Sequence, residues 1–535
     1  MILTPEEQLE RVLRESIEKC VEKPSDWVKS RILFGDDERD LIHSKELLEN
    51  RQKIKETMGF DPIDSKTSMF LVSCLGRRLL QLPSIREILL TFKIKEFPEI
   101  SYKLMKVLNS DSSTLLSILD ANKRLNWRSG SSTAKKILNM LELPMSLVNS
   151  LKDDARPSLE LISPYKVPPS LLDFQKNVKS DIQKIIGKNQ RCLVIMPTGS
   201  GKTRTTIQSV VEFMMNSKGD ANGIVWIADR DELCEQAAES FSSLLPFFVN
   251  EITPIWRYWS GRNIELSHDG KNSIFEGIVI TSHQQLQRRL KEQDPIAEVI
   301  VQSSKVVIFD EAHRWLDWNE SLIRRIEDYK IKCKIIGLTA TPHRRESREN
   351  ARLLQMFNRR LITPYKETLQ DPGFTIRKLT DEGILAKRVD IKPEDIGCSF
   401  SFDSSPSTRL NESLRVIQEL IKGDSISIIV FTENVTQSRH LSICLSMLGV
   451  SAEYLHSGTS PSNRRRIIER FRSGELTVLL NYMILTTGFD APSIDTVLIL
   501  REQNNENLPV IQQMIGRGLR GPKFGGTEFC KVIIR

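Results

Sequence analysis

The stretch Pro197-Thr198-Gly199-Ser200-Gly201-Lys202-Thr203 constrains the fold of this chain more than any other. It follows an apolar run, Cys192–Met196, that predicts a buried strand, and it precedes a stretch, Arg204–Met215, that predicts a helix. A strand, a glycine-rich turn and a helix in this order form a phosphate-binding loop, because the backbone N–H groups point inward and the helix dipole adds positive charge. Lys202 supplies a charge for the β and γ phosphates, and Thr203 a hydroxyl for Mg²⁺.

Two adjacent carboxylates follow a second apolar run of the same kind. Val306–Phe309 predicts a buried strand, and Asp310-Glu311-Ala312-His313 stands at its carboxyl end. Because doubly wound sheets gather ligands at the carboxyl ends of their strands, this turn and the phosphate loop are expected to converge. Asp310 can hold Mg²⁺, usually through water, and Glu311 can orient and deprotonate an attacking water.

Short β-branched runs alternate with amphipathic helices over most of the chain. This alternation is typical of a parallel sheet with helices on both faces, and it occurs twice, which predicts two α/β domains in tandem. The first series is Cys192–Met196, Ile224–Ala228, Gly277–Thr281, Val306–Phe309 and Ile335–Leu338. The second series is Ile426–Phe431, Ala452–Leu455, Thr477–Asn481, Thr496–Leu500 and Cys530–Ile534.

The first part of the chain is helical by pattern and has no chemistry that we can assign. Thr4-Pro5-Glu6-Glu7 predicts a capped helix start, and Ser44–Met58 is one of several further helices expected here. Four prolines between 157 and 169 then indicate a linker. The predicted division is a helical domain at 1–156, a linker at 157–170, α/β domains at 171–362 and 408–535, and a connector at 363–407.

Composition narrows the class of protein. The net charge of +7 and the pI near 8.8 suit a polyanionic partner. None of the eight cysteines forms a C-x-x-C pair, so a zinc site, an iron–sulfur cluster or a disulfide framework is not expected. No apolar run is long enough to span a bilayer, and the N-terminus lacks a signal-peptide core. These features predict a cytoplasmic protein with no membrane partner.

Taken in order, the motifs resemble those of superfamily 2 helicases of the DEAD/DEAH-box type, over roughly residues 171 to 526. Gln175 occupies the place of the adenine-reading glutamine, with Leu172 where an arginine is common. The matching stretches of the first α/β domain are Leu171–Gln175, Pro197–Thr203, Ala228–Leu233, Ile280–Ser282, Asp310–His313 and Thr339–Thr341. Those of the second are Ile429–Thr432, Tyr454–Gly458, Leu485–Pro492 and Gln513–Arg520.

The resemblance assigns roles to individual residues. It implies catalytic roles for Asp310, Glu311, Arg517 and Arg520, and a Mg²⁺ site at Thr203 and Asp310. It implies nucleotide contacts from Gln175, Thr198, Gly199, Ser200, Gly201, Lys202, Thr203, Gly488 and Asp490. It implies nucleic-acid contacts from Arg230, Thr281, Thr432 and Thr487, and coupling of hydrolysis to strand binding through His313, Thr339, Thr341 and Gln513.

Two arginine clusters of the second domain differ in how specific they are. Arg517 and Arg520 are three positions apart, so they lie on one face of a helix, and the resemblance makes them arginine fingers that reach the γ-phosphate from across a cleft. The run Arg464–Arg466 either contacts nucleic acid or faces water.

The fold implied is two RecA-like doubly wound parallel sheets in tandem behind a helical domain, with ATP and Mg²⁺ as cofactors. Leu379–Ala386 resembles a segment between the motor domains of type I and type III restriction motors and related repair translocases. This likeness favours an ATP-dependent helicase or translocase that acts on DNA in repair or in restriction of phages. An RNA helicase and a non-processive, ATP-gated clamp remain alternatives.

A nuclease or other subunits of a defence or repair complex are possible partners of such a motor. The chain stops at Arg535, soon after Arg520. Either a C-terminal region is missing from this sequence, or the second domain ends abruptly.

Overall fold

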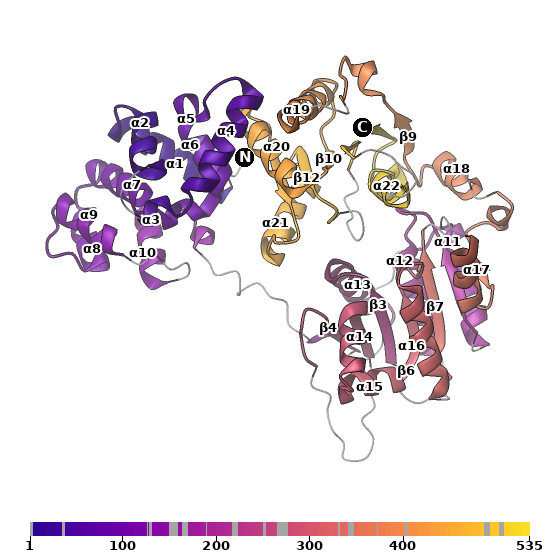
Figure 1. The fold of residues 1–535 in the computed structure, drawn as a ribbon. Coiled ribbons are helices and arrows are strands. Elements are labelled where there is room, and N and C mark those ends of the chain that lie inside the picture. Colours follow the sequence, from indigo (N-terminus) through magenta and orange to yellow (C-terminus); the bar gives the residue numbers. More distant parts are fainter. Residues whose placement is uncertain are drawn as a thin grey trace.

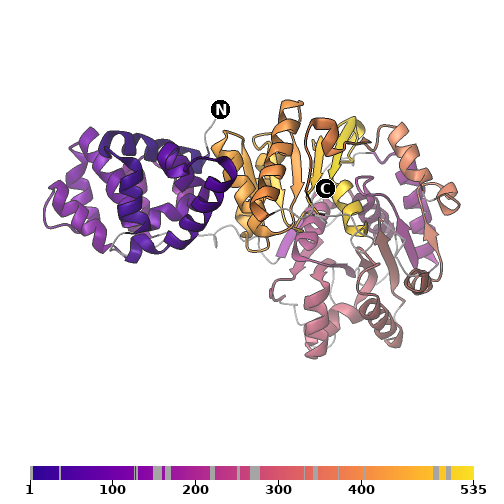
Figure 2. The same ribbon diagram turned by 45° about the horizontal axis from the view of Figure 1, so that its top comes forward.

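The chain forms a helical domain and two α/β lobes in this computed structural model, and the second lobe lies between the helical domain and the first lobe (Figures 1 and 2). The structure describes the chain except residues 1–3, 35–37, 126, 128–130, 149–158, 163–169, 189, 217–222, 250–252, 265–276, 330–331, 341–346, 372, 402–404, 486–492 and 502–507.

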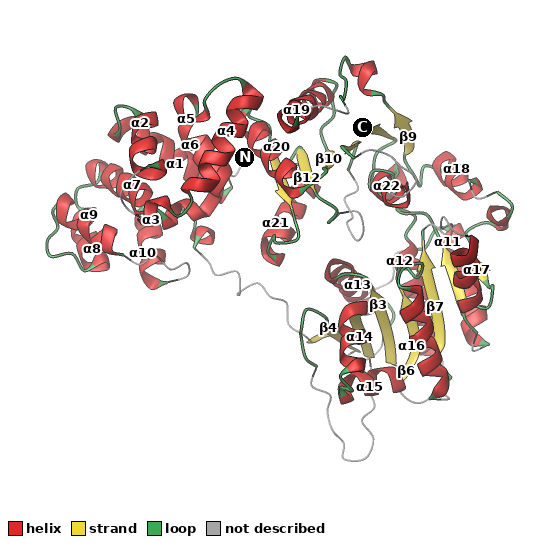
Figure 3. Cartoon of the chain, viewed as in Figure 1, coloured by secondary structure: helices red, strands yellow, loops and turns green. Residues whose placement is uncertain are grey.

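The first lobe is built on an eight-stranded sheet in the order β1-β4-β5-β3-β6-β7-β2-β8, parallel except for β1. Its central strands are buried along their whole length, so helices cover both faces (Figure 3). The strands are β1 (Leu159–Ile162), β2 (Cys192–Ile195), β3 (Gly223–Ala228), β4 (Thr253–Tyr258), β5 (Gly277–Ser282), β6 (Ser304–Phe309), β7 (Lys334–Thr339) and β8 (Leu361–Ile362). The helices are α11 (Asp173–Gly187), α12 (Lys202–Asn216), α13 (Asp231–Leu244), α14 (His283–Lys291), α15 (Pro295–Gln302), α16 (Leu316–Asp328) and α17 (Ser347–Met356).

The second lobe has a six-stranded, fully parallel sheet in the order β11-β12-β10-β13-β14-β9. Its strands are β9 (Lys387–Asp390), β10 (Ile428–Phe431), β11 (Ala452–Leu455), β12 (Val478–Asn481), β13 (Thr496–Ile499) and β14 (Phe529–Ile534). Its helices are α19 (Pro406–Lys422), α20 (Val435–Met447), α21 (Pro461–Arg472) and α22 (Leu508–Ile515). The predicted fold class, two parallel-sheet α/β domains behind a helical region, is confirmed.

The helical domain begins with the predicted cap. The Thr4 hydroxyl accepts the N–H of Glu7 at 3.1 Å, and the Glu7 carboxylate accepts the N–H of Thr4 at 2.7 Å. Its α-helices are α1 (Pro5–Cys20), α2 (Pro24–Val28), α3 (Glu38–Leu41), α4 (Ser44–Met58), α5 (Pro62–Ser65), α6 (Thr67–Leu75), α7 (Pro83–Glu96), α8 (Ile100–Leu108), α9 (Leu115–Arg124) and α10 (Ser132–Met140).

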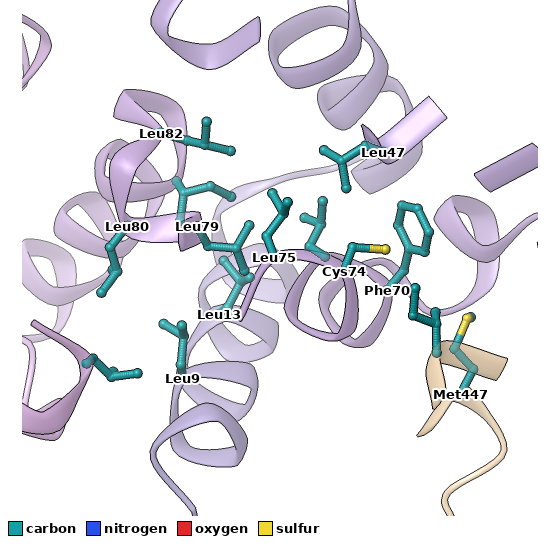
Figure 4. Packing of buried hydrophobic residues seen from close by; sticks show 14 of the residues in the cluster. Leu9, Leu13, Leu47, Phe70, Cys74, Leu75, Leu79, Leu80, Leu82 and Met447 are labelled. Carbon is teal, nitrogen blue, oxygen red and sulfur yellow. The ribbon is translucent and has the colours of Figure 1, made fainter. Parts of the chain in front are cut away.

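The helical domain and the second lobe share one hydrophobic core. Buried side chains of α6, such as Phe70 and Cys74, belong to the same cluster as Met447 of α20 (Figure 4). Polar contacts also join the helical domain to the second lobe. Lys53 donates to the Ser407 hydroxyl at 2.5 Å, and ion pairs form between Arg439 and Glu46 at 3.5 Å and between Arg466 and Glu6 at 3.4 Å. Arg466 therefore makes a contact between domains that neither alternative for the run Arg464–Arg466 anticipated.

The chain crosses from the first lobe to the second between two consecutive residues. Leu385 belongs to the hydrophobic core of the first lobe, and Ala386 to that of the second. The N–H of Ala386 donates to the Leu519 carbonyl at 3.1 Å, and the N–H of Gly521 donates to the Ile384 carbonyl at 3.0 Å. The crossing therefore lies against the end of the last predicted motif, directly after α18 (Phe374–Asp381).

Four strands differ from the sequence expectation. β4 and β8 were not predicted, while β1 and β9 lie in the stretches predicted as linker and connector. β1 and β9 are edge strands, and β8 pairs with β2 at the other edge of the first sheet. Edge strands are short and less apolar, so their own sequence signals them weakly.

Candidate nucleotide site and nucleic-acid edge

The turn after β2 bends through two left-handed glycines. Gly199 has a φ of 83° and Gly201 a φ of 82°, a region that favours glycine. A Cβ on Gly201 would also lie 2.5 Å from Nε2 of Gln175. Ser200 is fully buried, and its hydroxyl donates to the Pro197 carbonyl at 2.7 Å. The loop thus has a fixed curl immediately before α12, the geometry that binds phosphate.

Gln175 braces this loop from α11. Its side chain is 1 % exposed, and Nε2 donates to the Ser200 carbonyl at 2.9 Å while Oε1 accepts the N–H of Leu172 at 3.0 Å. Sequence reasoning gave Gln175 a contact with the base and missed this tie to the loop. Its contact with adenine stays a prediction.

Lys202 reaches from the loop to the two carboxylates after β6. Its Nζ lies 3.2 Å from Oε1 of Glu311 and 4.0 Å from Oδ1 of Asp310. Burial raises the pKa of Asp310 to about 6, against the opposing charge of Lys202. Burial acts in the same sense on the pKa of Glu311, but the charges of Lys202, His313 and Arg314 outweigh it and lower that pKa. Glu311 is therefore an anion at neutral pH.

These residues fit a magnesium-bound triphosphate. One buried oxygen of Glu311, Oε2, accepts no hydrogen bond from the described residues. The candidate ligands, the Asp310 carboxylate and the Thr203 hydroxyl at the start of α12, are oxygen donors of the kind that Mg²⁺ prefers. Over the described residues there is no group of three or more His, Cys, Asp or Glu side chains that would hold a metal by themselves.

His313 and Thr339 join the carboxylate turn to the end of β7. His313 Nδ1 lies 3.0 Å from the Thr339 hydroxyl, and both residues are buried. The N–H of Met196, at the end of the strand that enters the phosphate loop, donates to the Thr339 carbonyl at 3.2 Å. The structure therefore brings together two of the residues predicted to couple hydrolysis to strand binding.

The second lobe meets the phosphate loop through the turn that follows α22. A Cβ on Gly516 would lie 2.9 Å from Cβ of Thr198, and one on Gly199 would lie 3.6 Å from the Leu519 carbonyl oxygen. Arg517 is close enough for its charge to lower the pKa of Asp310. The prediction that Arg517 and Arg520 lie on one face of a helix is wrong, because α22 ends at Ile515 and both arginines follow it. Their role as arginine fingers stays a prediction.

Arg520 and Gln513 belong to the same motif as Arg517, but the contacts described for them lie away from the carboxylates. Arg520 forms a β-bridge with Leu385, and its Cζ lies 5.7 Å from the centre of the Phe524 ring. Gln513 is 4 % exposed, and its Oε1 has no hydrogen-bond partner among the described residues.

Three of the four predicted nucleic-acid contacts are described, and they lie at the carboxyl ends of strands, but two of their side chains are covered. Arg230 is partly exposed at the start of α13, with Nε 3.4 Å from the Asp229 carboxylate. Thr281 and Thr432 are fully buried, so a strand at these turns would meet their backbone. Thr341, Thr487, Gly488 and Asp490 lie outside the described residues.

Sequence reasoning missed an aromatic cluster beside this edge. Trp315 donates its indole N–H to Asp229, and Arg314 donates to the same carboxylate. The Trp315 ring stacks on His283 with 4.5 Å between ring centres. The signal available was a pair of tryptophans, Trp315 and Trp318, directly after the carboxylate motif.

The described helices and the cysteines bear on two further predictions from the sequence. Among the helices that the structure describes, none combines the length and apolar character needed to cross a bilayer. The eight cysteines are free, and burial raises the pKa of Cys192, Cys444 and Cys530 to about 12. Those thiols are neutral under ordinary conditions.

Two family models match the chain. Residues 169–344 match the model described as the res subunit of type III restriction enzymes. Residues 412–521 match the helicase conserved C-terminal domain. The two matches coincide with the lobes that meet at the phosphate loop.

Curated relatives bear helicase names. The chain is 25 % identical over 386 residues to the putative ATP-dependent helicase IRC3 of Saccharomyces cerevisiae, covering 68 % of this chain and 51 % of the relative. It is 22 % identical over 334 residues to the ATP-dependent RNA helicase DRS1 of Candida albicans, covering 61 % and 48 %. The chain therefore spans about half the length of these relatives.

Among solved structures, the chain is similar to the helicase MrfA bound to DNA and AMPPNP, with a TM-score of 0.50 and 14 % identity. The match covers 70 % of this chain and 52 % of the other. At this level of identity the likeness supports the fold alone.

Proposed function

Since this chain belongs to superfamily 2 of the helicases, in the group related to restriction motors and repair helicases, we propose that it is a nucleic-acid-dependent ATPase that translocates on or unwinds DNA. The observation that supports this proposal most is the meeting of two lobes at one phosphate loop. Lys202, Glu311 and Asp310 come from the first lobe, and the charge of Arg517 from the second lobe acts on Asp310.

Each of these groups has a task in hydrolysis. The phosphate loop and Lys202 bind the triphosphate, and Glu311, an anion at neutral pH, orients the attacking water and accepts its proton. Mg²⁺, held by Asp310 and Thr203, neutralises charge on the phosphates when bound. Arg517 stabilises the charge of the transition state only when the lobes are closed, so closure gates the reaction.

A bound strand regulates this closure in the proposed mechanism. A strand that contacts turns of both lobes at once favours the closed state. By reciprocal linkage the closed state then binds the strand more tightly. The contacts read phosphate and sugar, so binding should tolerate any sequence and weaken with salt.

DNA is the proposed substrate because the first lobe matches a restriction-enzyme model. The name of the relative DRS1 favours RNA as the second candidate. ATPase rates of the full chain with single-stranded DNA, duplex DNA, RNA and no polymer separate the two. Strand displacement, measured beside ATP turnover, separates a motor from an ATP-gated clamp. The restriction match also motivates a nuclease subunit as a partner in a defence or repair complex.

Lys202→Ala is the direct test of the nucleotide site. We expect turnover to fall to background with every polymer, because the charge on the β and γ phosphates is lost. Lys184→Ala is the matched control, since that lysine is largely exposed on α11 of the same lobe, where it pairs with Asp181 at 3.1 Å. Undiminished turnover in Lys202→Ala would remove the nucleotide assignment.

A further inference from the structure

Trp315 is an exposed aromatic side chain in a place where exposure is unusual. It is 48 % exposed, and it lies in the same turn as Glu311 at the carboxyl end of β6. Its φ of 55° is a left-handed conformation that bulky residues rarely adopt. Such a conformation persists only where the surroundings hold it, and it is common at functional sites.

The surroundings fix the indole from two sides. Its N–H donates to Asp229, which is 4 % exposed, and Arg314 donates to the other oxygen of that carboxylate. One face of the ring stacks on buried His283, with 4.5 Å between ring centres and an angle of 11° between the planes. Trp315 is therefore held rigidly while half of its surface remains open to solvent.

The support beneath Trp315 reaches the core of the lobe. His283 packs against Trp318 edge to face at 4.5 Å, and Trp318 packs in the same way against Phe309 at 6.4 Å. Burial lowers the pKa of His283, so its ring is neutral and stacks without a charge. A surface tryptophan anchored through three successive ring contacts is a preformed platform, and binding on it costs little ordering entropy.

The platform lies between turns that are predicted to hold the strand. Arg230 and Asp229 follow β3, and His283 follows the end of β5, two residues after Thr281. β5, β3 and β6 are neighbours in the sheet, so these turns and that of Trp315 share one edge. Arg230 and Arg314 both approach Asp229, which places cationic groups beside the exposed ring.

We propose that Trp315 is a stacking platform for one unpaired nucleobase of the bound strand. The proposal rests on the proposed function and adds a contact to the base, where that function requires only backbone contacts. Stacking on a tryptophan tolerates every base because every base has a π-face. The contact distinguishes single strands from duplexes, whose bases are already stacked.

The test measures binding of the full chain to two oligonucleotides of equal length, one of them lacking bases throughout. Trp315→Ala should weaken binding of the ordinary strand roughly 5- to 100-fold and leave binding of the abasic strand within about twofold. Trp315→Phe, which keeps a ring but not the indole N–H, should restore most of the loss. Equal weakening of both strands, or no weakening of either, would overturn the platform.

Two controls make the result specific. Tyr102→Ala removes an aromatic ring of similar exposure, 57 %, from the helical domain and should change neither affinity. Turnover of ATP without polymer and the thermal melting curve should match the unsubstituted chain in both Trp315 variants. If Trp315→Ala does not fold, the unsubstituted chain is bound to oligonucleotides that carry 2-aminopurine at one position each. Stacking on Trp315 should lower the fluorescence of 2-aminopurine in at least one position, and no decrease at any position would overturn the proposal.

The outcomes separate this inference from the proposed function. If the unsubstituted chain binds no strand and shows no stimulated turnover, both fail. If it binds and is stimulated while Trp315→Ala behaves identically, only the platform fails. A ring that instead contacts a protein partner would leave both affinities unchanged.

Discussion

The second lobe has two neighbours, and it meets them in different ways. With the helical domain it shares one continuous hydrophobic core, which runs from Phe70 of α6 to Met447 of α20. The hydrophobic cores of the two lobes are separate clusters, although Leu385 of the crossing belongs to the core of the first lobe and Phe524 of the second lobe packs against it. There the described contacts include close approaches of the backbone, such as that of Gly516 to the Thr198 side chain and that of Gly199 to the Leu519 carbonyl.

The difference separates a permanent interface from a working one. A shared apolar core cannot open without exposing buried side chains to water, which is unfavourable. Backbone approaches between two separately packed bodies can form and part with little loss. The helical domain should therefore move with the second lobe as one body, while the first lobe opens and closes against both.

The largest expected effect lies at the working interface. Arg517→Ala should lower kcat for ATP by about 10³- to 10⁵-fold, because it removes a charge of the second lobe that acts on Asp310. Nucleotide affinity should change little, as measured by titration with a fluorescent ATP analogue. Lys523→Ala, an exposed residue of the same lobe, is the control. Loss of nucleotide binding instead of turnover would contradict the finger role.

A cavity in the shared core tests the permanent interface. Phe70→Ala should cost about 3–5 kcal/mol of folding free energy, because it empties a fully buried site. Urea unfolding, followed by domain-resolved hydrogen exchange, should show the helical domain and the second lobe weakened together. Phe241→Ala, an equally buried ring of the first lobe, should weaken that lobe alone. Loss of protection in the helical domain with an unaffected second lobe would refute the shared body.

A methyl group at the contact between lobes should impair closure without unfolding either lobe. Gly516→Ala places a Cβ within 2.9 Å of Thr198, and a displacement of about 1 Å at a reacting centre costs about 10²-fold in rate. Strand-stimulated turnover should fall by that order while the melting temperature stays constant. Gly187→Ala, whose Cβ would make only an ordinary contact with Phe213 at 3.6 Å, should change nothing. Equal turnover in both variants would show that the lobes close elsewhere.

The smallest effect concerns the polar rim of the permanent interface. Arg78 and Arg439 outweigh partial burial and hold the pKa of Glu46 below its ordinary 4.5. A lowered folded-state pKa contributes stability above the unfolded value and loses it as pH falls through the folded value. Glu46→Gln should thus cost about 1 kcal/mol at pH 7 in urea unfolding, and nothing once Glu46 is protonated. If Glu46→Gln lowers the free energy of unfolding equally at pH 7 and at a pH where Glu46 is protonated, the ion pair is excluded as the cause.

Short sequence patterns predicted those elements whose structure depends on neighbouring residues in the chain. The capped start at Thr4 and the helix Ser44–Met58 depend on nearby residues alone, and both were predicted as the structure has them. The phosphate loop and the carboxylate turn were also placed correctly at the ends of buried strands. The predicted roles of their residues remain to be tested.

Tertiary partners decide what the sequence could not show. β9 is mostly exposed and is a strand only because β14 provides its ladder. The fusion of the helical domain with the second lobe depends on the fit of α6 against α20, which no pattern within either segment encodes. The same holds for Trp315, since its value as a platform comes from Asp229 and His283, both distant along the chain.

The crossing at Leu385 and Ala386, about which the two lobes can rotate, lies beside the phosphate loop. The helical domain extends from the far side of the second lobe, and α8 and α9 lie at its remote end (Figure 1). A rotation that displaces the phosphate loop by the width of an atom would therefore sweep those helices through a much longer arc. A molecule bound to those helices would therefore be displaced further than the phosphate loop in each opening and closing of the lobes.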